Sequence, residues 1–237
     1  MSDFFAALEA TWPAAALHRA GPWLLREGAG GGKRVSAATA ESDEALAAIG
    51  AMEAAQLALG QAPLVMLRAG EDALDAALAD AGYVVVDPVV AMAGPVAALA
   101  GPLPPLSAFT VWPPLAVQRE IWAEGGIGPA RVAVMERVAG PKTSLFARTS
   151  DRPAGTGFVA LEGTTAMVHA LEVRPALRRQ GAARHMLCAA ANWAAAQGAT
   201  EMCLAVTKAN GAARALYASL GLADVGSYHY RTKQAQP

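Results

Sequence analysis

A basic segment that contains one glycine, residues 174–184, connects an apolar stretch to a long alanine-rich stretch. Residues 164–173 are typical of a strand, Pro175 ends it, and the alanine-rich sequence after the basic segment predicts a helix. Unpaired N–H groups and the positive end of the dipole at a helix N-terminus attract anions, and Gly181, without a Cβ, lets an anion approach the backbone. Three arginines add full charges: Arg178, Arg179 and Arg184. The segment therefore predicts an anion-binding loop.

The order of residues in this loop, Arg178-Arg179-Gln180-Gly181-Ala182-Ala183, resembles a signature of the GNAT superfamily of acyl-CoA-dependent N-acyltransferases. In that family the pattern Arg/Gln-x-x-Gly-x-Gly/Ala holds the pyrophosphate of coenzyme A. The strand before the loop reads Ala170-Leu171-Glu172-Val173, and Asn210-x-x-Ala213-x-x-Leu216-Tyr217 lies one strand downstream, where a GNAT has its next helix. The resemblance implies an α/β (α+β) GNAT fold, with a mixed, mostly antiparallel sheet flanked by helices.

The resemblance also implies acetyl-CoA as the cosubstrate and a set of residues that bind it. In this family the central strand and the next strand splay apart, so that backbone groups can pair with the pantetheine arm; the matching positions here are Leu171 and Val173. The diphosphate then meets the amides of the loop and of the helix start. The expected coenzyme-binding residues are Leu171, Val173, Arg178, Arg179, Gln180, Gly181, Ala182, Ala183, Arg184, Asn210 and Ala213.

Tyr217 stands where many GNAT enzymes keep the tyrosine that acts as general acid toward the departing thiolate. Asn210 precedes it at the family spacing, which favours the same role here. A second interpretation is open, because Tyr217 also belongs to an apolar stripe on a predicted helix, in which it would only pack.

A base is needed as well, because an alkylamine with a pKa near ~10.4 is protonated at neutral pH. The run His169-Ala170-Leu171-x-Val173 is similar to a strand of arylalkylamine N-acetyltransferases, in which a histidine contributes to deprotonating the amine. An imidazole titrates near pH ~6.5, which suits this role. Those enzymes carry another histidine two residues earlier, where this chain has Met167. His169 is therefore a candidate base, but it lacks the second histidine with which it would form a proton relay.

Strand geometry leaves the role of His169 open. Strict alternation places it on the same face as Leu171 and Val173 unless a bulge intervenes, and Glu172 on the opposite face. A core histidine with an ordinary hydrogen bond is the alternative interpretation. In that case Glu172 is the reserve base.

Composition excludes several classes of function. The formal net charge of the 237 residues is −1, so there is no excess of positive charge for general nucleic-acid binding. The longest apolar run, residues 83–100, is interrupted by an acid and two prolines, short of the ~20 apolar residues of a membrane span. The N-terminus has acids and no signal pattern, so we expect a cytoplasmic protein that binds no membrane. Cys188 and Cys203, with no CxxC or histidine-rich companion, are expected to be buried thiols and no metal site.

The first third of the chain is expected to contain helices, turns and strands in alternation. Residues 4–17 have apolar positions at helical spacing, interrupted by Pro13, and glycines at 28–32 are expected to turn the chain into a strand at 34–38. Lys33 follows these glycines, but a phosphate-binding P-loop needs glycine at 27 and serine or threonine at 34. A hairpin turn is the better interpretation.

An internal similarity suggests two halves. A shift of 139 residues places 64–92 on 203–231, and each copy then reads strand, helix, glycine, strand, with strands expected at 83–86 and 89–92 in the first. The proline-rich residues 94–105 are expected to be a linker. We therefore expect a degenerate GNAT-like domain at 1–100 and a catalytic GNAT domain at 106–237. The first half carries acids at 41–44 where the second has its basic loop, so no coenzyme is expected there.

The function implied by the resemblance is direct transfer of an acetyl group from acetyl-CoA to a primary amine of a small-molecule or amino-acid-like acceptor. A non-catalytic CoA-binding or regulatory module is the first alternative. A Rossmann-type nucleotide-binding domain is the second, but the loop has one glycine where three are needed, and no acidic residue ends the following strand at Val206. The identity of the acceptor, the length of the acyl group and the oligomeric state are not legible in the sequence.

Overall fold

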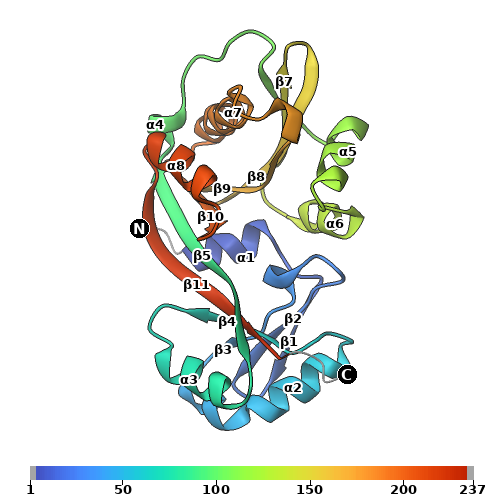
Figure 1. Cartoon of the computed structure of the whole chain (residues 1–237), viewed down its shortest axis with the longest axis vertical. Helices are drawn as coiled ribbons and strands as arrows, with labels where there is room; N and C mark the ends of the chain where they lie inside the picture. Colours follow the sequence, from blue (N-terminus) through green and yellow to red (C-terminus); the bar gives the residue numbers. More distant parts are fainter. Residues whose placement is uncertain (1–3, 234–237) are drawn as a thin grey trace. The chain divides into compact units, whose positions relative to one another are not determined.

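The computed structural model describes residues 4–233, which form two compact units (Figure 1). Unit 1 comprises residues 4–13, 91–206 and 210–225, and unit 2 comprises residues 14–90, 207–209 and 226–233. Strands β5 (Val84–Pro95) and β11 (Ala223–Thr232) each have one end in either unit. Each compact unit is therefore built from several separate segments of the chain. The expected division, with domains at 1–100 and 106–237, instead follows the order of the sequence repeat.

Unit 1 contains a mixed sheet in which the strands run in the order β5-β10-β9-β8-β7-β6. Their bounds are β6 Ala108–Val111, β7 Lys142–Thr149, β8 Arg152–Glu162, β9 Thr165–Val173 and β10 Glu201–Thr207. The four strands from β6 to β9 pair antiparallel, and β9 and β10 pair parallel. The expected mixed, mostly antiparallel sheet is confirmed.

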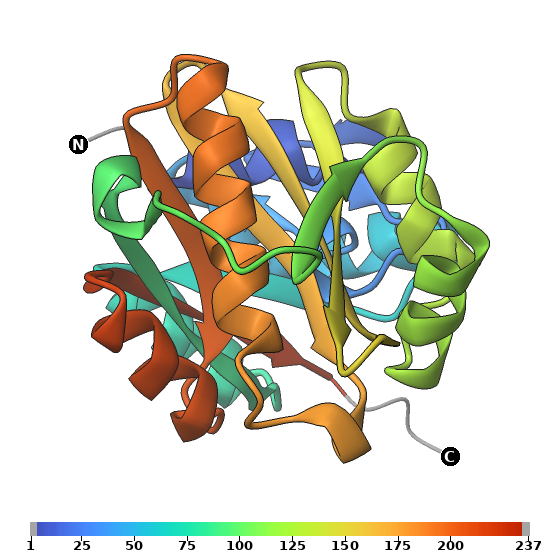
Figure 2. The same ribbon diagram turned by 90° about the horizontal axis from the view of Figure 1, so that it is seen from above.

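Helix α7 (Ala182–Ala196) lies along the strands on one face of this sheet (Figure 2). Its buried side chains recur at helical spacing, which is why the alanine-rich sequence forms a helix that can lie flat on a sheet. They include Ala182, Met186, Leu187, Ala190 and Ala194.

The opposite face is contacted by helices α1 (Phe4–Thr11) and α5 (Ala116–Glu124); α6 (Pro129–Arg137) follows α5. Gln118 of α5 is fully buried, and its Nε2 donates to Ser144 Oγ and to Leu145 O, both at 3.0 Å. Helix α1 ends before Pro13, so the expected helical stretch through Leu17 is wrong. Pro13 disfavours helix at the preceding residue, and Leu17 lies half-exposed in strand β1 (Ala16–Ala20).

Unit 2 packs two helices against short strands. Strands β1, β2 (Trp23–Glu27) and β3 (Thr39–Ala40) form an antiparallel sheet. The remaining elements are η2 (Asp43–Ala48), α2 (Ile49–Ala58), β4 (Leu64–Arg68) and α3 (Asp72–Asp80). The core of this unit is a cluster that contains Trp23, Leu25, Met52, Leu67 and Leu78.

Three expected elements of the first half differ from the structure. The strand expected at 34–38 is a 3₁₀ turn, η1 (Lys33–Val35), because Gly32 adopts φ 95° and sends the chain away from an extended path. The two strands expected around Asp87 are the single strand β5, which continues through Asp87 although this residue has a left-handed φ of 45°. The expected linker begins with a short helix, α4 (Val96–Leu99).

The internal similarity holds at the level of secondary structure. The shift of 139 residues carries α3 onto α8 (Gly211–Ser219) from end to end, and the first residue of β5 onto the first residue of β11. Gly82 and Gly221, which precede these strands, both adopt left-handed φ values, 86° and 88°. The two segments thus share local backbone conformation as well as element order.

Candidate functional site

The pairing between β9 and β10 stops partway along β9. The parallel register runs from Thr165–Glu201 to Val168–Leu204, whereas β9 itself continues to Val173. Beyond Val168, β9 still pairs with β8 on one edge, but its other edge has no described strand beside it. This is the opening that a pantetheine arm would need.

A bulge interrupts β9 at the start of this opening. Thr156 pairs with Glu172 and Phe158 pairs with His169, so Gly157 alone lies opposite Ala170 and Leu171. Ala170 takes a left-handed φ of 49°, which costs a residue with a Cβ about 1 kcal/mol. The bulge places His169 and Glu172 on the face of α1 and α5, while the side chains of Leu171 and Val173 pack beside Gly157 and Gly155 on the other face.

The basic loop leads from β9 into α7. A 3₁₀ turn, η3 (Pro175–Leu177), begins it, and two residues with left-handed φ follow: Arg179 at 63° and Gly181 at 86°. Gly181 caps α7, and its carbonyl accepts from His185 N at 2.9 Å. The amides of residues 182–184 precede this first intrahelical donor, so they point out of the helix end. An added Cβ on Gly181 would lie 3.3 Å from the His185 ring.

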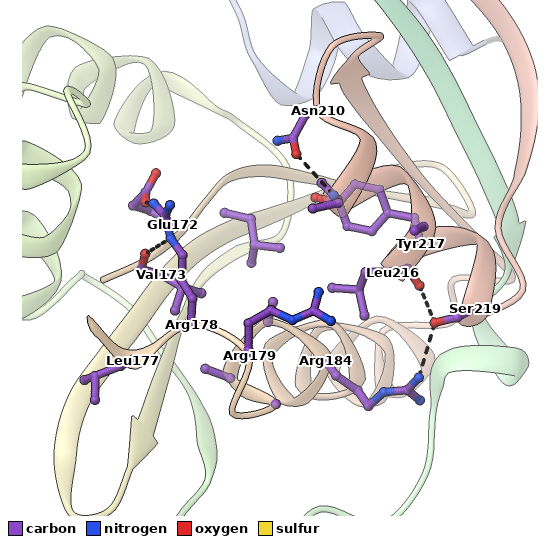
Figure 3. Close-up of a pocket in the computed structure, with 17 residues that line it drawn as sticks. Glu172, Val173, Leu177, Arg178, Arg179, Arg184, Asn210, Leu216, Tyr217 and Ser219 are labelled. Atoms are coloured by element: carbon purple, nitrogen blue, oxygen red, sulfur yellow. Dashed lines mark hydrogen bonds and ion pairs between the residues drawn. The ribbon is translucent and has the colours of Figure 1, made fainter. Parts of the chain in front are cut away.

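The loop, the end of β9 and helix α8 enclose a cavity of ≈ 640 Å³. One part of its lining is apolar and comes from β9 and α8, and another part is basic and comes from the loop and the start of α7 (Figure 3). All residues expected to bind the coenzyme line this cavity except Gln180, which the fold places outside it: Leu171, Val173, Arg178, Arg179, Gly181, Ala182, Ala183, Arg184, Asn210 and Ala213.

Helix α8 contributes Tyr217 to the same cavity. Asn210 is the N-cap of this helix, and its side-chain oxygen accepts from Ala213 N at 3.1 Å. The Tyr217 side chain is 8% exposed, and burial raises its pKa to about 12. The phenol therefore keeps its proton at neutral pH and is available as a donor.

The cations around the cavity have different partners. Arg178 Nη2 lies 3.2 Å from Glu172 Oε1, and its Nε donates to Val173 O at 3.0 Å. Arg184 donates to Ser219 Oγ at 3.3 Å, which links the start of α7 to the end of α8 (Figure 3). Arg179 lines the cavity and is exposed to solvent. The arginines thus lie on the side of the cavity where the helix amides also emerge.

The sequence model of the acetyltransferase (GNAT) family matches residues 110–222, the segment that forms the opening, the loop and the cavity. This segment is a GNAT acetyltransferase domain. The sequence is 29% identical to YobR of Bacillus subtilis, an uncharacterized N-acetyltransferase, in an alignment that covers 95% of each chain.

Solved structures show the same fold for the whole chain. A GCN5-related N-acetyltransferase from Kribbella flavida superposes with a TM-score of 0.71 at 18% identity, covering 97% of this chain and 93% of the other. A tandem GNAT protein from the clavulanic acid biosynthesis pathway gives a TM-score of 0.64 at 12% identity, covering 85% of this chain and 76% of the other. The GNAT domain is therefore accompanied here, as in those structures, by an N-terminal region.

His169 of the GNAT domain lies outside the cavity. Its side chain is 4% exposed and packs 4.9 Å from the Trp12 ring, and its Nε2 lies 2.8 Å from Thr11 Oγ1. Thr11 Oγ1 donates its own proton to Ala7 O at 2.6 Å, so it accepts from the imidazole, which assigns the imidazole proton to Nε2. His169 thus anchors α1 to β9 through a buried hydrogen bond.

Glu172 lines the cavity on the side opposite Tyr217 in Figure 3. Its side chain passes over the end of α5, where a Cβ on Gly125 would lie 2.7 Å from Glu172 Cγ and Cδ. Gly125 is therefore required for space, since its φ of −84° suits any residue. The structure brings Glu172, Tyr217 and the coenzyme-loop residues together and leaves His169 apart.

Several residues at this site were not identified from sequence. Leu177 and Ser219 line the cavity, and Trp122 and Gly125 of the α5 end contact β9. The glycine pair that ends α5 is the one sequence feature that could have pointed to a close approach there. Nothing in the spacing of Trp122 indicated its partner on a distant strand.

No described helix combines the length and the apolar character needed to cross a bilayer. Among residues 4–233, no group of histidine, cysteine, aspartate and glutamate side chains is arranged to hold a metal ion.

Proposed function

We propose that this protein is an acetyl-CoA-dependent N-acetyltransferase that transfers an acetyl group directly to a primary amine of a small-molecule or amino-acid-like acceptor. The observation that carries the proposal is the shared cavity: a helix N-terminus with arginines, the end of β9 that has no β10 partner and a buried phenol all line it. Each of these matches one part of the reaction, namely diphosphate binding, thioester positioning and thiolate protonation.

The donor groups present fit an acyl-CoA. The amides of residues 182–184 and the guanidinium groups of Arg179 and Arg184 supply hydrogen bonds and positive charge for a diphosphate. Apolar side chains of β9 and α8 line the rest of the cavity, which suits a pantetheine arm. When bound, acetyl-CoA supplies an activated acyl group as a thioester.

We assign the general acid to Tyr217. Its hydroxyl is protonated at neutral pH, because burial raises its pKa to about 12. Desolvation also raises the pKa of a thiol that leaves inside this cavity, which favours transfer of the phenol proton to the thiolate.

We assign the base to Glu172, which acts on the ammonium group directly or through one water. Its carboxylate lines the cavity, whereas the Nε2 proton of His169 is held by Thr11. A carboxylate also stabilises a bound ammonium by charge before it accepts a proton. His169 stays the alternative base, and its Nδ1 would then have to be the accepting atom.

Unit 2 is proposed to bind no coenzyme. Its described cavity, ≈ 260 Å³, is lined by Glu41, Asp43 and Glu71 together with a single arginine, Arg68. Carboxylates in these positions repel a diphosphate.

The proposal is tested by measuring thiol release from acetyl-CoA with a panel of primary amines and amino acids, alongside calorimetric titration with acetyl-CoA. We expect binding at micromolar concentration and acetylation of at least one amine class, confirmed by mass. Both candidate bases have partners in this structure, Glu172 in Arg178 and His169 in Thr11, which favours the alternative of a non-catalytic CoA-binding module. Binding without transfer across the panel would support that alternative; no binding at millimolar acetyl-CoA would remove both.

A further inference from the structure

The last turn of α5 and the glycine after it lie against residues 170–174 of the GNAT domain at three places. Trp122 Nε1 donates to Ala170 O at 2.8 Å, Gly125 makes room for the Glu172 side chain, and Glu124 accepts two hydrogen bonds from Arg174, at 2.7 and 2.8 Å. The residues of the turn are close in sequence, and so are their partners, which lie on β9 and directly after it. This turn therefore follows β9 along the part that has no β10 partner.

Trp122 makes the contact with the greatest consequence. Its side chain is fully buried, so the indole N–H would lose its hydrogen bond without replacement by water if Ala170 moved. Ala170 in turn adopts φ 49°, a conformation that an alanine avoids unless surrounding contacts enforce it. The hydrogen bond from the indole thus favours the left-handed conformation of Ala170 in the middle of β9.

The bulge at Ala170 decides where the reacting groups point. Without it, strict alternation would place His169 with Leu171 and Val173, and every side chain beyond it would be exchanged between the two faces. With it, Glu172 reaches the cavity edge over Gly125, and the Leu171 backbone borders the opening. A shift of this backbone by a fraction of an ångström would displace the base and the thioester-binding amides together.

We propose that Trp122 is a positioning residue for acetyl transfer: its indole N–H, through the Ala170 carbonyl, fixes the bulge that sets the place of Glu172 and of the unpaired end of β9. This inference rests on the acetyltransferase function proposed above. Trp122 acts through Ala170, so its loss is expected to lower kcat more than it weakens acetyl-CoA binding, since the loop and the α7 end are left intact.

The test compares Trp122→Phe, Ala170→Gly and the double variant in the full chain. Trp122→Phe keeps an aromatic ring and removes the N–H donor. Ala170→Gly leaves φ 49° without strain, so a glycine can keep the bulge without the indole. We expect backbone hydrogen exchange of residues 169–173 to rise about fivefold or more in Trp122→Phe, to stay close to the wild-type rate in Ala170→Gly, and to fall back in the double variant.

Kinetics give the second readout. We expect kcat at saturating acetyl-CoA to fall about tenfold in Trp122→Phe and to recover at least partly in the double variant, with the dissociation constant of acetyl-CoA within about threefold of wild type. Trp23→Phe is the matched control, because Trp23 Nε1 donates to Ala48 O at 3.1 Å from an equally buried position in unit 2. It should lower Tm without changing kcat or the exchange of residues 169–173.

Two results would overturn the inference: unchanged exchange of residues 169–173 in Trp122→Phe, or faster exchange that Ala170→Gly fails to reduce. If Trp122→Phe does not fold, Glu124→Gln replaces it. This substitution at an exposed position weakens the neighbouring contact with Arg174, so the exchange of residues 172–174 should become faster. An unchanged exchange rate there would contradict the proposed role of the turn. Exchange needs no ligand, so a wild-type protein without transferase activity would refute the proposed function and leave this measurement valid.

Discussion

Arg178 Nη2 lies 3.2 Å from Glu172 Oε1, so an arginine expected to meet the diphosphate is paired with the carboxylate assigned as base. The same guanidinium holds the Val173 carbonyl, which borders the opening in the sheet. A diphosphate at the start of α7 competes for Arg178 by charge. We therefore predict that binding of the coenzyme and release of Glu172 from Arg178 are coupled.

This coupling predicts the behaviour of Arg178→Gln. We expect the dissociation constant of acetyl-CoA to rise about three- to tenfold, because one cation near the diphosphate is lost. The dependence of that constant on ionic strength should weaken as well. Arg152→Gln, at an exposed position outside the cavity, is the control and should change neither quantity. An Arg178→Gln protein with wild-type affinity at all salt concentrations would contradict a role in diphosphate binding.

Gly181→Ala tests the anion-binding turn. The substitution forces an alanine to φ 86°, where its backbone is strained, and adds a Cβ 3.3 Å from the His185 ring, which must move by a few tenths of an ångström. We expect a loss of about 1 kcal/mol in unfolding free energy and at least a tenfold weaker acetyl-CoA complex in calorimetric titration. Gly198→Ala is closely matched, since Gly198 follows the other end of α7 at φ 85° with open space around it. It should cost similar stability and leave the affinity unchanged.

Tyr217→Phe separates catalysis from packing. Phenylalanine keeps the ring in the cavity, so acetyl-CoA affinity should stay within about twofold, whereas kcat should fall about 100-fold if the hydroxyl donates the proton. Tyr83→Phe is the control, because Tyr83 donates to Glu53 Oε1 at 2.9 Å within unit 2. Steady-state kinetics of both variants with one good amine decide the question. Equal turnover of Tyr217→Phe and wild type would assign Tyr217 to packing alone.

Gly125→Ala tests the placement of Glu172. The added methyl group would overlap the carboxylate arm, at 2.7 Å from its Cγ and Cδ, and push it out of its present path. We expect kcat to fall about tenfold, with the dissociation constant of acetyl-CoA nearly unchanged. Gly50→Ala, in a helix with open space, is the control and should slightly raise Tm. A fully active Gly125→Ala enzyme would argue against Glu172 as the base.

The hydrogen bonds of Asp75 lead us to expect that the unfolding free energy of unit 2 depends on pH. Arg231 donates to both of its oxygens and His229 contacts one, and these hydrogen bonds lower the pKa of the carboxyl from 3.8 to about 2. A lowered pKa means that the unfolded chain takes up the proton first, so this stabilisation is present above pH ~4 and lost as the pH falls toward 2. Asp75→Asn should cost about 1–2 kcal/mol in urea unfolding at pH 7 and little at pH 2.

The control for this prediction is Asp80→Asn, at an exposed position near the end of the same helix. Its unfolding free energy should stay within about 0.5 kcal/mol of wild type at both pH values. A constant difference between Asp75→Asn and wild type from pH 7 to pH 2 would show that the carboxylate charge is not the source of the stabilisation.

The sequence by itself determined the loop, the helix after it and the helix that carries Tyr217. Gly181, the arginines and the Asn210–Tyr217 spacing act through backbone geometry within a few residues, and such local relations are legible in a short motif. The apolar stripe of α7 was likewise a local pattern, and it fixed which side of the helix packs on the sheet.

Only the tertiary structure decided the surroundings of β9. His169 meets Thr11 across 158 positions of sequence, and Trp122 reaches Ala170 across 48. These contacts form because packing brings distant elements together, and the alanine that accepts the second one adopts a left-handed conformation that the strand pattern alone disfavours. The bulge then exchanges the faces beyond it, so the position of Glu172 at the cavity, with His169 outside it, depended on a single backbone torsion.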